Sequence, residues 1–167
     1  MMSRRSLRLG ATLLATLLVA PVCESLAAEE CPASADRARL SALLDRYVDA
    51  VNAHETSSFP AIFADGYVQH SGRSPSGLAA QIANIQRILD TWPDIQMHID
   101  DRIIDCEKIA ARVTFTATHS RPVQGIAPTG RKISFRTIDI WRVEDGKLAE
   151  HWDLLDTAGQ QKQLRGE

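Results

Sequence analysis

Apolar residues recur at helical spacing in two stretches that precede Pro93. Residues three and four positions apart lie on one face of an α-helix, so each stretch predicts a helix with one buried face. Ser34 is a reasonable N-cap for the first helix, and the second ends before Pro93. The two faces consist of Leu40, Leu43, Leu44, Tyr47, Val48 and Val51, and of Leu78, Ile82, Ile85, Ile88 and Leu89.

The segment between these helices has mixed character. Residues 57–63 suit a short helical turn, because Pro60 falls among its first residues. Residues 67–70 are predicted to be extended, and residues 71–77 have the composition of a loop.

From Ile95 onward the apolar period changes to two, which predicts β-strands. Four strands follow one another, with hairpin turns at residues 105–108 and 144–147. The second turn is the sharper signal, because Asp145-Gly146 suits positive backbone angles. Helices followed by a four-strand antiparallel meander make an α+β domain. The alternating residues are Ile95, Met97 and Ile99; Val113, Phe115 and Ala117; Ile133, Phe135, Thr137 and Trp141; and Leu148, Trp152 and Leu154.

One polar residue shares a row with large apolar side chains. Asp139 alternates with Thr137 and Trp141, so it points toward the predicted core. Burying a carboxylate is costly unless it is paired or takes up a proton. The hairpin makes the next strand a neighbour, so Asp139 is expected near His151 or Asp153 if their rows share a face. Two carboxylates and an imidazole are the groups needed for proton transfer beside a carbonyl.

The same polar cluster is also compatible with a structural role or a metal site. In the structural role, Asp139 orients His151 within a hydrogen-bond network in which nothing reacts. A metal site is the less favoured interpretation, because neither the His-x-x-x-His nor the His-Glu-x-x-His spacing of common metal sites occurs in the sequence. A nucleophilic serine is disfavoured, because the chain has no Gly-x-Ser-x-Gly elbow. The residues available to a metal are His70, His119, His151, Asp139 and Asp153.

The last strands carry apolar residues on both faces, with Trp152 and Leu154 opposite the row of His151. Two helices can cover only one face of such a sheet. The other face is therefore expected to pack against a second copy of the chain, which predicts a homodimer.

The N-terminus has the pattern of an export signal over residues 1–28. Arginines at positions 4, 5 and 8 precede an apolar run at 9–20, which is shorter than the 20 or so residues of a membrane-spanning helix. Small residues before position 29 suit cleavage after Ala27 or Ala28. A periplasmic or secreted protein with no membrane contact after cleavage is expected. An uncleaved anchor, a lipoprotein with Cys23, and a twin-arginine signal in place of general secretion are the alternatives.

Composition excludes several classes of protein. The 167 residues are 44% hydrophobic and 24% charged, as in a globular domain. The net charge of −2 becomes −4 when the signal leaves, so no basic field exists to bind nucleic acid. Export leaves Cys31 and Cys106 as a candidate disulfide, worth on the order of 4 kcal/mol in the chain-entropy model. Two free thiols are the alternative.

Four short segments of the sequence are informative when taken together, because their order and spacing are more specific than any one of them. They are Tyr67-Val68-Gln69-His70, Thr91-Trp92-Pro93-Asp94, Thr118-His119 with residues 125–131, and residues 145–153. Together they resemble the SnoaL-like polyketide cyclases, or ester cyclases, of the nuclear transport factor 2-like superfamily. The resemblance extends from about Leu40 to Asp156. On this basis residues 29–167 form one SnoaL-like domain with a core at about 35–158.

The resemblance implies a cone-shaped α+β barrel, in which a curved, mostly antiparallel sheet packs on N-terminal helices around a pocket. It also implies acid/base ring closure with neither cofactor nor metal, and the catalytic aspartate of the cyclases matches Asp153. A family histidine matches Asp139 and a family asparagine matches Gln69. These two differences from the family concern which substrate the pocket accepts more than they concern the fold.

The sequence thus predicts a cofactor-free enzyme, of cyclase, isomerase or aldol type, for a small apolar carbonyl compound. Asp153 is expected to move the proton, with His151 and Asp139 tuning or sharing it. The alternatives are a non-catalytic periplasmic protein that binds a small ligand, and a structural dimer with a filled core. The residues expected to contact the substrate are Gln69, His70, His119 and Trp141.

Overall fold

A computed structural model describes residues 34–167 of the chain. The predicted signal segment and Cys31 lie outside the described residues. The elements follow in the order α1 (Ser34–Asn52), α2 (Phe59–Ile62), β1 (Phe63–Gln69), α3 (Leu78–Thr91), β2 (Gln96–Asp105), β3 (Lys108–Thr118), β4 (Lys132–Glu144), β5 (Lys147–Leu155) and α4 (Thr157–Arg165).

The strands form one sheet in the order β1-β5-β4-β3-β2. Strands β2 to β5 pair as an antiparallel meander, which confirms the prediction. Strand β1 adds a fifth strand, parallel to β5, and contains most of the segment that is predicted to be extended. Asp145 and Gly146 have φ angles of 50° and 73°, as the predicted β4–β5 turn requires.

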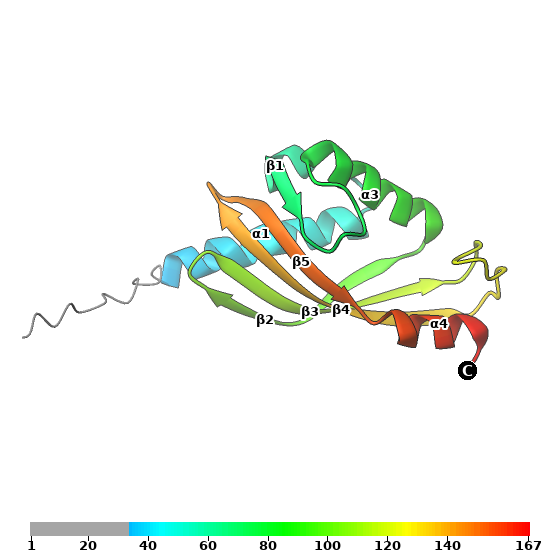
Figure 1. The fold of residues 1–167 in the computed structure, drawn as a ribbon. Coiled ribbons are helices and arrows are strands. Elements are labelled where there is room, and N and C mark those ends of the chain that lie inside the picture. Colours follow the sequence, from blue (N-terminus) through cyan, green and yellow to red (C-terminus); the bar gives the residue numbers. More distant parts are fainter. Residues whose placement is uncertain (1–33) are drawn as a thin grey trace, which may run out of the picture.

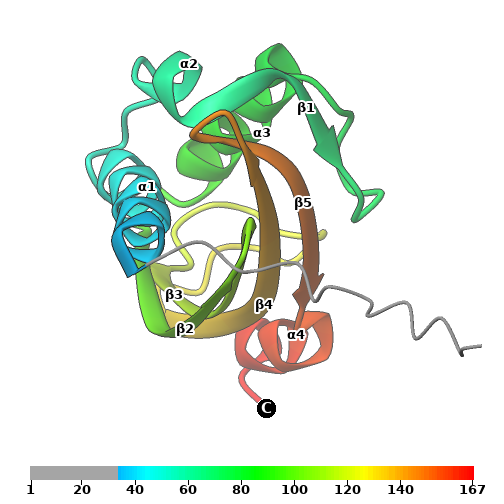
Figure 2. The same ribbon diagram turned by 90° about the vertical axis from the view of Figure 1, so that its left-hand side faces the viewer.

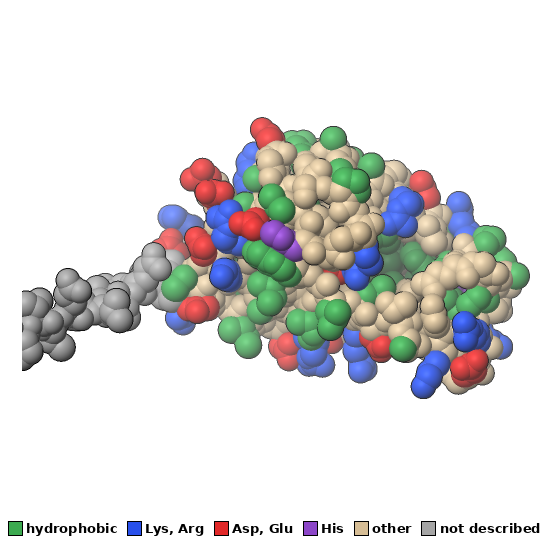
Figure 3. Space-filling model, viewed as in Figure 1, with side chains coloured by type: hydrophobic (Ala, Val, Ile, Leu, Met, Phe, Trp, Pro, Cys, Tyr) green, Lys and Arg blue, Asp and Glu red, His purple; other side chains and the backbone are tan. Residues whose placement is uncertain are grey.

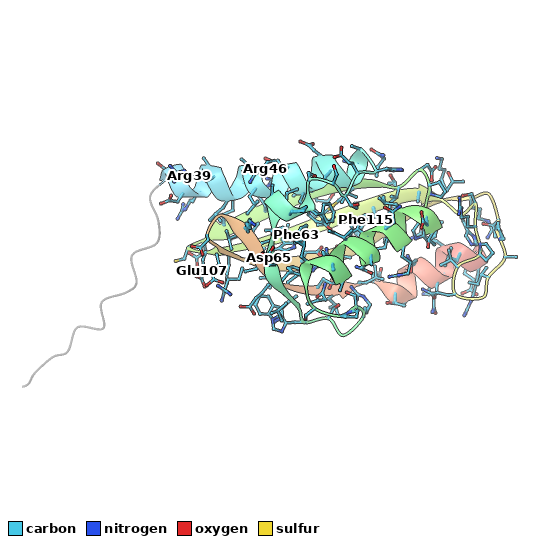
Figure 4. The ribbon with its side chains drawn as sticks, turned by 90° about the horizontal axis from the view of Figure 1, so that it is seen from above. Arg39, Arg46, Phe63, Asp65, Glu107 and Phe115 are labelled. Atoms are coloured by element: carbon cyan, nitrogen blue, oxygen red, sulfur yellow. The ribbon has the colours of Figure 1, made fainter. Side chains whose placement is uncertain are left out.

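The sheet is strongly curved, and the helices lie in two places around it (Figures 1 and 2). Helices α1 and α3 lie on the concave side, where Figure 4 shows Phe115 of β3 between them. Helix α4 packs against β4 at the other end of the sheet. This arrangement is the α+β fold that the sequence predicts, with N-terminal helices on a mostly antiparallel sheet.

The interior follows the predicted periodicities. Along β4, every second residue is buried, from Ile133 through Thr137 and Asp139 to Val143. In α1 the predicted face is buried or packed against the core. The Asn52 side chain then fastens the end of α1 to β2, because its Oδ1 and Nδ2 bond the amide and carbonyl of Met97 at 2.7 and 3.0 Å.

Two features differ from the expectation. Strict alternation places Leu148 on the face opposite His151, yet Leu148 is fully buried. The register shifts between Arg142 and Val143, where Leu148 pairs with Val143 and Glu150 pairs with Arg142, so the strand turns Leu148 inward. Helix α4 is absent from the sequence prediction and lies mostly beyond the expected core, but its Leu164 is fully buried.

The convex face of the sheet carries exposed apolar side chains. Leu154 is 75% exposed and Ile138, its partner across the β4–β5 ladder, is 49% exposed. Ile140 and Ile103 lie on the same face and are also exposed. Among residues 34–167, none of the helices has the length and apolar character needed to cross a membrane.

Candidate functional site

A cavity of about 440 Å³ opens between α3 and the concave face of the sheet. Figure 3 shows its opening as a hollow with basic side chains at the rim. One part of the wall is apolar and aromatic, and Phe115 stacks on Phe135 there with ring centroids 5.3 Å apart. Ile85, Ile88 and Trp92 of the α3 region face the same space. This part suits the apolar portion of a small molecule.

Asp139 of β4 lies in the polar part of the cavity wall, with only 6% of its surface exposed. Its Oδ1 is 2.9 Å from Nε2 of His151 on β5, and its Oδ2 accepts a hydrogen bond from the Thr137 hydroxyl. The prediction that Asp139 lies beside His151 is confirmed. Both carboxylate oxygens have partners, which is what a buried carboxylate needs.

The contacts of Gln69 define the tautomer of His151. The amide N–H of Ser71 donates to Gln69 Oε1 at 3.1 Å, which places the Gln69 NH₂ group on His151 Nδ1 at 3.0 Å. Since an NH₂ group can only donate, Nδ1 accepts and the ring proton is on Nε2. His151 therefore donates to Asp139 and has no proton on the nitrogen nearest Asp153.

Trp141 lies beneath this network rather than in the cavity lining. Its ring stacks on the His151 imidazole with centroids 4.9 Å apart and an interplanar angle of 2°. Tyr47 packs edge-on against Trp141 at 6.2 Å. Trp141 thus fixes the plane of the imidazole, which makes it a positioning residue.

Asp153 is the second carboxylate in the wall, and its side chain is 5% exposed. Its Oδ2 forms an ion pair with Arg73, from the loop between β1 and α3. Its Oδ1 is buried, is 4.0 Å from His151 Nδ1, and has no hydrogen-bond partner among the described residues. Asp153 therefore presents a carboxylate oxygen with free lone pairs beside an oriented imidazole.

Two tyrosines lie near this cluster and stay protonated. Burial raises the pKa of Tyr47, and the negative charge of Asp139 raises it further. Burial is also the largest cause of the raised pKa of Tyr67, followed by the charges of Tyr47 and Asp139. The Tyr67 hydroxyl has no hydrogen-bond partner within residues 34–167. Neither phenol is therefore available as a base near neutral pH.

Besides Trp141, two more of the four predicted substrate contacts, His70 and His119, lie outside the cavity lining. His70 bonds Glu150 Oε2 at 2.7 Å and stacks on Trp152, with ring centroids 4.3 Å apart. His119 is fully buried, bonds the Thr129 hydroxyl at 3.0 Å, and packs against Trp92, which itself lines the cavity. The structure thus brings together the side chains of Gln69, Asp139, His151 and Asp153, with Trp141 behind them. The side chains of His70 and His119 lie elsewhere.

Arg73, Gln81 and Arg87 are among the cavity residues that sequence reasoning missed. Arg73 lies in a segment predicted only as loop, and nothing in the local pattern marks it. Gln81 lies four residues before Ile85 on the apolar face of α3, so helical spacing is the signal that could have found it. Gln81 is 3% exposed, and its Oε1 has no partner in the described part of the chain. Within that same part, no group of three His, Cys, Asp or Glu side chains is arranged to hold a metal ion.

Comparisons with known proteins place these features in context. The profile of the family described as SnoaL-like polyketide cyclase matches residues 41–164. The solved structure of TsrD from Streptomyces laurentii is 31% identical, with a TM-score of 0.72, and the match covers 77% of this chain and 96% of TsrD. None of the curated proteins matches the chain.

Two further solved structures have the same fold. AclR from Streptomyces galilaeus is 27% identical with a TM-score of 0.70, over 78% of this chain and 87% of AclR. A SnoaL-like polyketide cyclase from Agrobacterium tumefaciens is 22% identical with a TM-score of 0.67, over 75% of this chain and 97% of that protein.

Proposed function

The chain belongs to the SnoaL-like polyketide cyclase family, and we propose that it is a cofactor-free acid/base enzyme for a small apolar carbonyl compound. The reaction is of the cyclase, isomerase or aldol type. The observation that carries this proposal is the unpartnered Oδ1 of Asp153, which lies in a cavity wall 4.0 Å from His151 Nδ1.

The proposed reaction begins at a carbon next to the substrate carbonyl. Asp153 takes a proton from this carbon, becomes a neutral acid and leaves an enolate. In an aldol ring closure the enolate carbon attacks a second carbonyl carbon of the same molecule, and the resulting alkoxide takes the proton back from Asp153, which regenerates the carboxylate. In an isomerisation the proton returns to a different carbon. Neither route needs an oxidant or a reductant.

The surrounding residues support this assignment. The NH₂ group of Gln69 uses one hydrogen on His151, and its second hydrogen is free to bond an enolate oxygen in the cavity. Asp139 keeps His151 in one tautomer and one orientation. The aromatic wall at Phe115 and Phe135 accommodates the apolar part of the substrate.

The direct test is exchange of α-protons in D₂O. We use 2-tetralone, a neutral bicyclic ketone, and follow the loss of its α-proton signals by NMR. The wild-type protein is expected to accelerate exchange at least about 100-fold over a buffer blank, as positioned acid/base groups do. Saturable binding of 2-tetralone with no accelerated exchange would instead identify a ligand-binding protein. Mass spectrometry of compounds that co-purify with the protein identifies the natural ligand in either case.

We also propose that the protein works after export, as a periplasmic or secreted domain. The support is the pattern of residues 1–28, in which a basic start, a short apolar run and small residues follow one another. N-terminal sequencing of the protein from the periplasm or medium is expected to start at Ala28 or Glu29. A chain that keeps Met1 or Met2 and sediments with membranes would refute export.

A further inference from the structure

The charges lining the cavity are unevenly distributed with depth. Its acidic residues, Asp139 and Asp153, have side chains that are 8% and 5% exposed. Its basic residues, Arg73 and Arg87, are exposed at the mouth. A molecule that enters therefore meets two guanidinium groups before it meets a carboxylate.

Arg73 is held at this mouth by the loop that carries it. The Gln69 amide donates to Ser76 Oγ at 3.0 Å, and the Gly77 amide donates to the Tyr67 carbonyl at 2.6 Å. These two bonds close the base of the loop on either side of Arg73. Its side chain is 48% exposed and extends inward to Asp153 Oδ2, so one face of the guanidinium remains accessible.

Arg87 has no acidic partner in the described part of the chain. Its Nη2 donates to Asn84 Oδ1 at 2.7 Å, one turn earlier on α3. An amide oxygen orients a guanidinium without neutralising it. A guanidinium with free donors presents the fork geometry that recognises carboxylates and other oxyanions in a bidentate manner.

We propose that the substrate carries an anionic oxygen group, such as a carboxylate, and that Arg73 leaves Asp153 to bind this group, with Arg87 as the second cation. This inference rests on the proposed function, because it concerns the same cavity. The anion replaces Asp153 on Arg73, so the number of ion pairs is unchanged. Asp153 is then left buried without a cation, which favours its uptake of a proton from the substrate.

The exchange of partners links binding to chemistry. With Arg73 in place, the ionised form of Asp153 is stabilised, and Asp153 is a weaker base than it is without Arg73. Once the substrate anion has taken Arg73, His151 is the only basic side chain of the described residues that remains within 4.0 Å of the Asp153 carboxylate, and it faces Asp153 with an unprotonated nitrogen. Anionic substrates thereby bind more tightly than neutral ones, and they react faster than a neutral ketone such as 2-tetralone, for which Asp153 keeps Arg73 as a partner.

Two fluorescent dyes that differ by one anionic group test the proposal. They are 8-anilinonaphthalene-1-sulfonate and its neutral parent N-phenyl-1-naphthylamine, titrated into the wild-type protein and its variants. We expect the sulfonate to bind about tenfold more tightly than the neutral dye, as a charge-assisted hydrogen bond allows. Arg73→Gln and Arg87→Gln should each remove most of this preference while the affinity for the neutral dye stays within about twofold.

A control variant separates the cavity from the convex groove at Ile138 and Leu154, whose lining includes Arg112 and Arg136. Arg112 is paired with Asp101, so Arg136→Gln is the control, and it should leave the sulfonate preference intact. Equal affinities for the two dyes in the wild-type protein would overturn the proposal. So would a preference that is lost in Arg136→Gln and kept in Arg73→Gln.

Asp153→Asn distinguishes this proposal from the proposed function. Because Arg73 no longer has to leave a carboxylate, the sulfonate affinity should rise several-fold in this variant, whereas a purely structural Arg73 would give no rise. An unchanged or lower sulfonate affinity would overturn the exchange of partners. If the dye results hold and 2-tetralone exchange is absent, the anion site stands and the catalytic proposal fails.

Discussion

Asp139 and Asp153 are directly paired residues of the β4–β5 ladder, and both face the cavity. Their surroundings nevertheless differ. Asp139 uses both oxygens, on His151 and on Thr137. Asp153 has one oxygen on Arg73 and one with no hydrogen-bond partner among residues 34–167.

This difference assigns separate roles to two residues of the same type. A carboxylate with all its lone pairs engaged orients its neighbours, whereas one with a free oxygen can accept a proton. Asp139 is therefore a positioning residue, and Asp153 is the candidate base.

The first prediction concerns Asp153→Asn. The amide has the same shape as the carboxylate but cannot accept the proton, so accelerated 2-tetralone exchange should fall at least about 100-fold. The melting temperature should stay close to that of the wild-type protein. Asp101→Asn, which removes an exposed carboxylate paired with Arg112 on the convex face, is the matched control. Exchange that persists in Asp153→Asn would remove this residue from the catalytic role.

The second prediction compares two substitutions of Asp139. Asp139→Leu leaves the buried Nε2–H of His151 without an acceptor and should cost about 1–3 kcal/mol of unfolding free energy. Asp139→Asn keeps an oxygen acceptor and should cost less. Urea unfolding measures both. The double variant Asp139→Leu, His151→Leu removes the orphaned donor and should recover part of the loss, whereas equal stability of the leucine and asparagine variants would refute the argument.

Much of the fold and half of the site were accessible from the sequence, because they depend on periodicity. The period of two along β4 placed Asp139 inward, and the Asp145-Gly146 turn made β5 its neighbour. The alternation along the strands could not show which residues of the helices and loops lie against the sheet. His70 illustrates this, because it follows a β1 strand whose parallel pairing with β5 has no local signal, and it turns toward Glu150 instead of the cavity.

The position of Arg73 in the cavity could not be predicted from the local sequence. Its position depends on two hydrogen bonds that close the loop after β1, and on β1 lying beside β5. Both are consequences of tertiary structure. The register shift that turns Leu148 inward is likewise invisible to a strict alternation, because one extra residue in a strand reverses the faces that follow.

The third prediction is a homodimer through the convex face of the sheet. Ile138 and Leu154 are exposed there and pair across the β4–β5 ladder, and contiguous apolar surface of this kind marks an interface. Sedimentation at micromolar concentration should give the mass of two mature chains. Leu154→Lys should shift the mass to one chain, and Ala83→Lys, on the exposed side of α3, should not. A wild-type mass of one chain would refute the dimer.

The fourth prediction concerns Cys31 and Cys106, the two cysteines that the proposed cleavage leaves in the chain. Exported protein purified without reductant should show no reactive thiol in the denatured state, because Cys31 and Cys106 are expected to form a disulfide. Reduction should then release two thiols and lower the melting temperature. Two reactive thiols before reduction would refute the bridge.

The fifth prediction follows from the buried phenol of Tyr67. Its hydroxyl has no hydrogen-bond partner in the described structure, so Tyr67→Phe should cost less than about 1 kcal/mol at pH 7.

Burial and the nearby charges raise the pKa of Tyr67, so above pH 10 the unfolded state releases the phenolic proton while the folded state keeps it. The unfolding free energy of the wild-type protein therefore falls as pH rises, by about 1.4 kcal/mol per pH unit for each such tyrosine. Urea unfolding between pH 8 and 11 should show a shallower fall in Tyr67→Phe, and the shallowest in the double variant with Tyr47→Phe, which removes the second of the chain's two tyrosines. Equal slopes in all three proteins would mean that these phenols ionise without unfolding.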